Sequence, residues 1–311
     1  MANMMATRNA YGEALKEIGG KNKDIVVLDA DLSGSTKTAV FKKEYPDRFF
    51  NVGISEQSLM GTAAGLAAAG KIPFASTFAM FATGRAFEII RNSICYPKLN
   101  VKIAATHAGL TVGEDGASHQ AIEDISIMRS IPNMVVLNPA DGVEARLCVL
   151  KASEYVGPVY IRLGRSNVPV IFDENYTFEI GKGVELKSGK DVTIIATGIM
   201  VAKALEASEM LSEEGISARV INISTIKPID KDIIIKAAKE TKGIVTAEEH
   251  SIIGGLGSAV AEVLVENCPV PMKRVGVEDT FGESGNGDEL LVKYGLTPEN
   301  IIKNVKSVLS L

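Results

Sequence analysis

Apolar runs alternate with helical patterns along the whole chain. In the first half, short runs rich in valine and isoleucine are typical of buried strands, and they cover residues 24–28, 49–54, 101–105, 134–137 and 159–163. Between them, residues 10–18, 87–96 and 140–155 have the spacing of helices. Continuous apolar strands separated by helices are typical of a sheet covered on both faces. The pattern therefore predicts a mostly parallel sheet flanked by helices.

The alternation breaks and then starts again in the second half. Residues 169–190 are rich in Pro, Gly, Asn and charged side chains, so we expect a linker at 173–190. After it, the pattern predicts strands at 191–197, 217–223 and 243–248 and helices at 200–214 and 232–239. The sequence thus predicts an α/β chain of two domains, residues 1–172 and 191–311, each with a mostly parallel sheet flanked by helices.

Composition narrows the class of protein. A chain of 311 residues, 46% hydrophobic and 23% charged, has enough apolar material for two cores. Its net charge of −5 gives no electrostatic reason to bind nucleic acid. Cys95, Cys148 and Cys268 have no CxxC spacing, so free thiols in a reducing compartment are expected. With no apolar run of membrane-spanning length and no apolar leader, we expect a cytoplasmic protein without a membrane partner.

A single carboxylate stands where one apolar run meets a helical segment. The run at 48–54 leads to Glu56, and the small residues at 59–69 predict a tightly packed helix directly after it. A carboxylate in such low-dielectric surroundings is expected to have a pKa above its ordinary value of about 4.3. As a neutral acid it could donate a hydrogen bond to a ring nitrogen. The alternative is an ordinary first-turn carboxylate favoured by the helix dipole.

Aromatic and histidine side chains follow two other predicted strands. Phe78 and Phe81, three residues apart at a strand end, could form an apolar wall for a flat ring, although core packing is the commoner role. His107 and His119 are two of the three histidines, and with Asp115 they fall in the Gly-rich loop after the 101–105 strand. The carboxyl edge of an open α/β sheet is where ligands bind, and histidine with carboxylate suits proton transfer near neutral pH. Zinc binding is less well supported, because the spacing fits no usual ligand pattern and no cysteine is near.

Cationic and hydroxyl residues at other predicted strand ends complete the candidate site. Arg8, Ser35 and Arg165 could hold a phosphate, although each alone is an ordinary surface residue. The glycines of 254–257 do not match the dinucleotide-binding pattern, because Val260 stands where its last glycine would be. They are better interpreted as a Gly-rich helix entry.

Taken in this order, the motifs resemble the C-terminal half of a transketolase, which comprises a pyrimidine-binding domain and a smaller C-terminal domain. The resemblance runs from Arg8 to about Ser258 and implies a thiamine diphosphate enzyme that transfers a two-carbon ketol unit from a ketose phosphate to an aldose phosphate. By this resemblance Glu56 protonates the aminopyrimidine ring of the cofactor. The remaining matches imply that Phe78, Phe81 and Asp31 bind the cofactor, that His107, Arg8, Ser35 and Arg165 hold the sugar phosphate, and that Asp115 and His119 contact its hydroxyl and carbonyl groups as catalytic residues.

The sequence departs from the family pattern at two points. Gly84 stands where full-length enzymes often have a third aromatic residue. More consequentially, the Gly-Asp-Gly motif that holds the cofactor diphosphate through Mg²⁺ is missing, and residues 285–288 match it only loosely. No metal site is therefore expected in this chain. A partner chain, the N-terminal section of the enzyme, is expected to hold the Mg²⁺ and the diphosphate.

The assembly and two alternative functions follow from the same residues. Gly61, Ala64, Gly65 and Ala68 would share one helix face, and the resemblance favours self-association there over packing on the sheet, giving at least two copies of each chain. One alternative function is half of a 1-deoxyxylulose-5-phosphate synthase-like enzyme, which the presence of His107 disfavours. The β subunit of a 2-oxo acid dehydrogenase shares the architecture but lacks the histidine-bearing loop. The second alternative function is a non-catalytic assembly subunit, which is disfavoured because such a subunit would not need buried ionisable groups.

Overall fold

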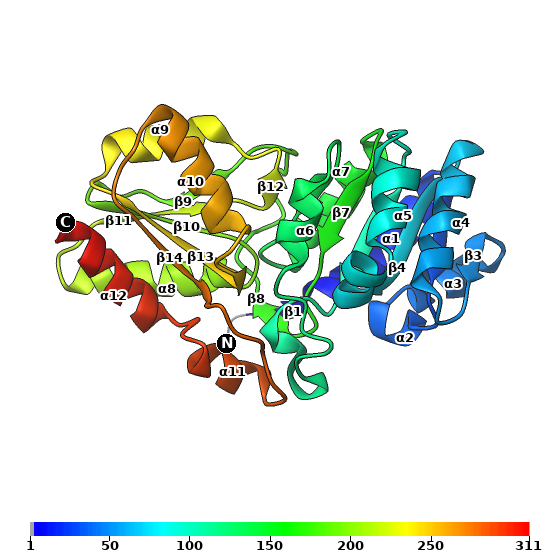
Figure 1. The fold of residues 1–311 in the computed structure, drawn as a ribbon, viewed down its shortest axis with the longest axis horizontal. Helices are drawn as coiled ribbons and strands as arrows, with labels where there is room; N and C mark the ends of the chain where they lie inside the picture. Colours follow the sequence, from blue (N-terminus) through cyan, green and yellow to red (C-terminus); the bar gives the residue numbers. More distant parts are fainter. Residues whose placement is uncertain (1–2, 311) are drawn as a thin grey trace.

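The computed structural model describes residues 3–310 and contains two α/β halves side by side (Figure 1). The strands are β1 (Met4–Ala6), β2 (Ile25–Asp29), β3 (Phe49–Asn51), β4 (Ile72–Phe78), β5 (Lys102–Thr106), β6 (Val135–Leu137), β7 (Val159–Arg162), β8 (Asn167–Pro169), β9 (Val184–Lys187), β10 (Val192–Ala196), β11 (Ala218–Asn222), β12 (Thr225–Lys227), β13 (Ile244–Ser251) and β14 (Met272–Val277). The helices are α1 (Thr7–Lys21), α2 (Ser33–Thr36), α3 (Ala39–Glu44), α4 (Glu56–Ala68), α5 (Phe87–Ile89), α6 (Asp124–Ser130), α7 (Gly142–Glu154), α8 (Met200–Glu213), α9 (Lys231–Glu240), α10 (Leu256–Asn267), α11 (Gly287–Lys293) and α12 (Pro298–Leu309). Short 3₁₀ turns η1 (Pro46–Arg48) and η4 (Leu110–Asp115) and π-helical turns η2 (Phe81–Arg85) and η3 (Ile90–Cys95) complete the chain.

The two large sheets confirm the predicted α/β architecture. The first has the strand order β12-β6-β7-β5-β4-β2-β3, parallel except for β12, and the second has the order β14-β13-β10-β11-β9, parallel except for β9. A small antiparallel pair, β1 with β8, lies apart from them. Because β12 comes from the second half of the chain and pairs with β6, the first sheet is completed across the two halves.

Helices cover both faces of the first sheet. On one face, Leu15 of α1 and Val149 of α7 pack with Val27 of β2 in one apolar cluster. On the other face, Leu59 of α4 and Ile90 of η3 belong to a second cluster that continues into α9 and α10 of the second half. Burial of these strands from both sides explains why their sequences are continuous apolar runs.

The prediction that residues 49–54 form a buried strand is wrong. The run at 49–54 was expected to be buried, but β3 ends at Asn51 and lies at the edge of the first sheet, where it pairs with β2 alone. Phe50 is 40% and Ile54 78% exposed, because nothing within the described chain covers that edge. An apolar run at a sheet edge has the same composition as one in a core, so the sequence could not separate the two.

The segment predicted as a linker, 173–190, contains the short strand β9, which joins the edge of the second sheet. The domain limits themselves stay a prediction. Among the described residues, no helix is long and apolar enough to cross a membrane.

Candidate active site

The candidate residues gather at the carboxyl edge of the first sheet. Strands β4, β5 and β2 are parallel neighbours, so Phe78 at the end of β4 and His107 just after β5 lie at the same edge. This is the edge at which open α/β sheets bind ligands. A series of side-chain contacts connects most of the predicted residues there.

Aromatic rings form one wall of the site. Phe78 stacks on the His107 imidazole with ring centres 3.9 Å apart, and its ring centre lies 6.0 Å from that of Phe81 at an angle of 21°. His119 meets Phe81 edge-on, with ring centres 5.2 Å apart. The two phenylalanines and two histidines that the sequence singled out therefore make one continuous aromatic surface, rather than two unrelated core pairs.

His107 is held as a neutral imidazole. Its Nε2 lies 3.3 Å from Nη1 of Arg8, which can only donate, so Nε2 accepts and the ring proton sits on Nδ1. Nδ1 in turn donates to Oγ1 of Thr106 at 2.9 Å. Burial, reinforced by the charges of Arg8 and Arg165, lowers the pKa of His107 to about 3. The imidazole is therefore uncharged near neutral pH.

Arg8 contacts this imidazole, and Arg165 lies near enough for its charge to act on it. Arg8 Nη1 donates to the main-chain oxygen of Ser35 at 3.0 Å, which places the Ser35 turn beside His107. Arg165 Nη1 donates to Val112 O at 2.6 Å and lies 3.8 Å from the Asp115 carboxylate. Burial and the charge of Arg165 lower the pKa of Arg8, as expected for two cations near each other. An anion bound between the two arginines would relieve the repulsion between their charges.

Glu56 begins α4 and is 4% exposed, in agreement with the predicted position at a helix start. Its Oε2 lies 3.2 Å from Nη1 of Arg85, and the Arg85 guanidinium stands 4.3 Å from the ring centre of Phe81. Arg85 therefore joins Glu56 to the aromatic wall. Arg85 was not predicted from the sequence, where its only signal is a lone cation four residues after Phe81.

Asp31 lies slightly apart from the other candidates. It is exposed, with a positive φ of 64°, and it exchanges hydrogen bonds with Asn51, whose Nδ2 donates to Asp31 Oδ1 at 2.7 Å. The buried acid of this turn is Asp29, which the sequence did not single out. Asp29 accepts from Thr36 and Thr38 and so fixes the turn that carries Ser35.

The described side chains form no cluster of metal ligands. Within residues 3–310, no three His, Cys, Asp or Glu side chains lie close enough together to hold a metal ion. The loose match at residues 285–288 serves a local purpose, since Asn286 Oδ1 caps α11 by accepting from the main chain of Asp288 and Glu289.

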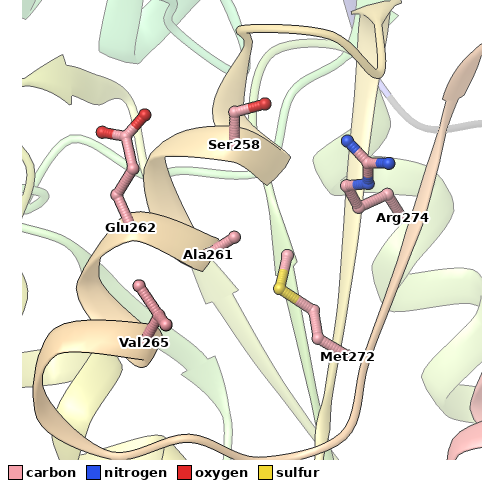
Figure 2. Close-up of a pocket in the computed structure, with 6 residues that line it drawn as sticks. All are labelled: Ser258, Ala261, Glu262, Val265, Met272 and Arg274. Carbon is pink, nitrogen blue, oxygen red and sulfur yellow. The ribbon is translucent and has the colours of Figure 1, made fainter.

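An open pocket of about 470 Å³ lies elsewhere, between α10 and β14 of the second half (Figure 2). It is lined by Ser258, Ala261, Glu262, Val265, Met272 and Arg274, none of which the sequence analysis selected. Glu262 is held there by an ion pair with Arg129 at 2.6 Å. The pocket is therefore separate from the gathered residues.

Comparison with known proteins gives consistent matches over nearly the whole chain. Residues 3–170 match the family described as transketolase, pyrimidine binding domain, and residues 181–301 match transketolase, C-terminal domain. A protein of Methanocaldococcus jannaschii, provisionally named a transketolase C-terminal section, is 58% identical over 96% of this chain and 94% of its own length. A 6-deoxy-6-sulfo-D-fructose transketolase subunit of a Clostridium species is 46% identical over 97% of this chain and 94% of its own.

Among solved structures, one described as a split gene transketolase, inactive beta4 tetramer, has a TM-score of 0.93 and 62% identity over 99% of both chains.

Proposed function

Because this chain belongs to the transketolase family as its C-terminal section, we propose that it is one subunit of a split transketolase that transfers a two-carbon ketol unit from a ketose phosphate to an aldose phosphate. The observation that carries the proposal is the unbroken series of contacts from Glu56 through Arg85, Phe81 and Phe78 to His107. That series joins a buried acid, a flat aromatic wall and the His107–Arg8 pair, which would bind an anion, in one site.

The residues present fit the ring end of thiamine diphosphate, the cofactor of this family. A flat aromatic wall suits a heteroaromatic ring, and the buried carboxylate of Glu56 stands at the end of that wall, joined to it by Arg85. When bound, the cofactor supplies the carbon nucleophile that carries the two-carbon unit. In this proposal Glu56 holds and returns a proton at the ring nitrogen N1′, while Phe78 and Phe81 orient the ring. Asp31 is proposed to border the cofactor at the adjacent turn.

A sugar phosphate fits the other end of the site. Arg8 and Arg165 supply positive charge near neutral His107, and the Ser35 turn lies against Arg8. The two guanidinium groups are the donors that suit a phosphate, and His107, whose Nε2 accepts from Arg8, helps to orient one of them. Asp115 and His119 stand on the loop beside Arg165 and Phe81, where they would contact the hydroxyl and carbonyl groups of the sugar and move protons on them.

A partner chain is proposed to complete the enzyme. Diphosphate and Mg²⁺ need an array of oxygen ligands, for which we propose an N-terminal-section subunit. Self-association is proposed across α4, where Gly61 and Gly65 have no atoms within 4 Å of a Cβ position and Ala68 is exposed. Only Ala64 of the predicted face is buried within the chain. The solved relative described as a beta4 tetramer agrees with association between copies of such a chain.

Mixing the two subunits tests the proposal. Two-carbon transfer between sugar phosphates should be absent with either chain alone and appear when the two are combined with thiamine diphosphate and Mg²⁺. Turnover by this chain alone, purified free of its partner, would contradict a shared site. No turnover by a stable, cofactor-loaded pair would contradict the transferase assignment.

A further inference from the structure

The loop that carries Asp115 and His119 is closed at its base within the first half. Ala108 and Ala121 form a parallel bridge, and Gly109 N donates to Ala121 O at 2.8 Å. Between these ends the loop has positive φ values at Gly109, Gly113 and Gly116, and its internal structure is limited to η4 and a turn in which His119 N donates to Gly116 O at 2.9 Å. A loop with so little internal structure needs contacts from outside to hold two substrate-facing side chains in place.

Glu249, from β13 of the second half, supplies one such contact. Its side chain is buried, and its Oε1 accepts a hydrogen bond from the main-chain N–H of Thr111 at 2.7 Å. A Cβ at Gly109 would lie 2.3 Å from the Glu249 carboxyl carbon. The loop main chain thus packs directly on this carboxylate, which fits only because residue 109 is a glycine.

The main chain of Glu249 is itself fixed to the first half. Arg162 Nη2 donates to Glu249 O at 2.9 Å and to Ala121 O at 3.3 Å, and its Nε donates to the buried Asp124 carboxylate at 2.9 Å. One buried arginine therefore ties Glu249 and the end of the loop to the same sheet. A hydrogen bond that is buried and charge-assisted is stronger than one at the surface.

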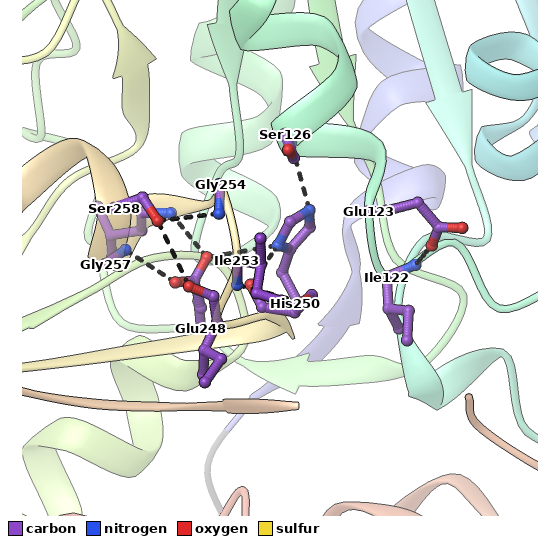
Figure 3. A network of polar contacts seen from close by, with 12 residues as sticks. Ile122, Glu123, Ser126, Glu248, His250, Ile253, Gly254, Gly257 and Ser258 are labelled. Atoms are coloured by element: carbon purple, nitrogen blue, oxygen red, sulfur yellow. Dashed lines mark hydrogen bonds and ion pairs between the residues drawn. The ribbon is translucent and has the colours of Figure 1, made fainter. Parts of the chain in front are cut away.

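The residues on either side of Glu249 make its position rigid (Figure 3). Glu248 accepts from the main chain of Leu256 at 2.7 Å and of Gly257 at 2.8 Å, at the start of α10. His250 donates from Nδ1 to Ser251 O at 2.7 Å and accepts at Nε2 from Ser126 N at 3.3 Å, which links β13 to α6. Since successive side chains of a strand point to opposite faces, these contacts leave Glu249 aimed at the loop.

Residues 283–285, also from the second half of the chain, contact the loop near Gly116 and Gln120. Gln120 Nε2 donates to Glu283 O at 2.9 Å and to Leu110 O at 3.1 Å. A Cβ at Gly116 would lie 2.5 Å from Ser284 Oγ. The turn that holds Asp115 is therefore pressed against residues 283–285.

We propose that Glu249 is a positioning residue of the transferase site: its carboxylate fixes the main chain of the loop at Thr111, and thereby places Asp115 and His119 for the sugar. The inference rests on the proposed function. It gives the second half of the chain, which contributes none of the candidate site residues, a defined part in substrate binding. Glu249 acts through the loop and touches neither cofactor nor sugar.

Three variants of the assembled pair test this role. Glu249→Ala removes the acceptor for Thr111, and KM for the sugar phosphate should rise about 10-fold or more, the effect expected when a charged hydrogen bond is lost. Glu249→Gln keeps an oxygen at the same place and should return KM to within about 3-fold of wild type. Arg129→Met is the matched control, because it breaks other contacts between the halves, the ion pair with Glu262 and the hydrogen bond to Gly254 O, without touching the loop. Its KM should equal that of wild type.

A second readout does not depend on turnover. Amide hydrogen exchange in the isolated chain should accelerate across residues 109–120 in Glu249→Ala and stay unchanged there in Arg129→Met and Glu249→Gln. Unchanged exchange in Glu249→Ala, or the same increase in KM for all three variants, would overturn the positioning role. If the wild-type pair is inactive but the exchange pattern is as expected, the transferase assignment fails. The conclusion that Glu249 fixes the loop at Thr111 then still holds.

Discussion

His107 and Arg8 should contribute to sugar phosphate binding by clearly different amounts, because one is neutral and the other charged. His107 has a pKa of about 3 and stays uncharged throughout the physiological range, whereas Arg8 keeps its charge. The informative changes are His107→Asn and Arg8→Met. Asparagine is chosen because residue 107 has a positive φ of 59°, which asparagine tolerates better than alanine does.

The magnitudes follow from the kind of hydrogen bond lost. His107 acts on the phosphate only by holding Arg8 at Nε2, so His107→Asn should cost about 0.5–1.5 kcal/mol and raise KM for a phosphorylated sugar about 2- to 13-fold. A hydrogen bond from a charged group contributes about 1.5–3 kcal/mol, so Arg8→Met should raise it about 13- to 160-fold. With acceptors that lack the phosphate, neither change should alter KM.

Steady-state transfer by the complete pair, measured from about pH 5 to 8, checks both parts. Because the lowered pKa keeps His107 neutral across this range, KM should show no inflection that disappears in His107→Asn. Such an inflection would show that the imidazole titrates. Equal losses in the two variants would equally refute the assignment of a neutral His107 beside a charged Arg8.

Two further predictions concern the scaffold. Gly109→Ala combines a positive φ of 85° with a Cβ 2.3 Å from the Glu249 carboxyl carbon, so it should lower the free energy of unfolding, measured by urea titration, by about 2–4 kcal/mol. Gly53→Ala is the control: it has a similar φ of 74° but nothing within 4 Å of the new Cβ, and it should lower that free energy by about 1 kcal/mol. Equal losses in the two variants would contradict the packing on Glu249. Lys102→Met leaves Asn100 Oδ1, Tyr155 O and Gly157 O without their buried donor and should destabilise the chain by about 2–4 kcal/mol while KM is unchanged, since Lys102 begins β5 at the edge opposite the site. Burial lowers the Lys102 pKa to about 7, below its unfolded value, so its contribution to stability should increase with pH from about 7 to 10.5. The Met variant should lose this pH dependence. If the difference in free energy of unfolding between wild type and variant did not change with pH, the lowered pKa would be disproved.

Much of the fold could be predicted because most strands are covered on both faces. Apart from Lys102, the run at 101–105 is apolar because both faces of β5 are buried, and Glu56 could be placed because a helix of small residues follows it directly. These are local signals. The burial of 49–54 was wrong because an edge strand has the same composition as a central one.

The parts that escaped prediction depend on contacts distant in sequence. β12 is three residues long and joins a sheet whose other strands end before residue 163. Arg85 reaches Glu56 because η2 is a π-helical turn, which shifts the residues that share a helix face. Glu249 and Thr111 are 138 positions apart, so no spacing or motif links them. Such partners become visible only when the two halves are packed together.

The proton transfer assigned to Glu56 can be measured without any sugar. Deuterium exchange at C2 of the bound cofactor, stopped by acid and read by NMR, should be fast in the wild-type pair. In Glu56→Gln it should be slower by about 10²–10⁴-fold, because the amide keeps the volume but cannot supply the proton. His107→Asn, as the control, should exchange at the wild-type rate. Wild-type exchange in Glu56→Gln would contradict the claim that this chain activates the cofactor.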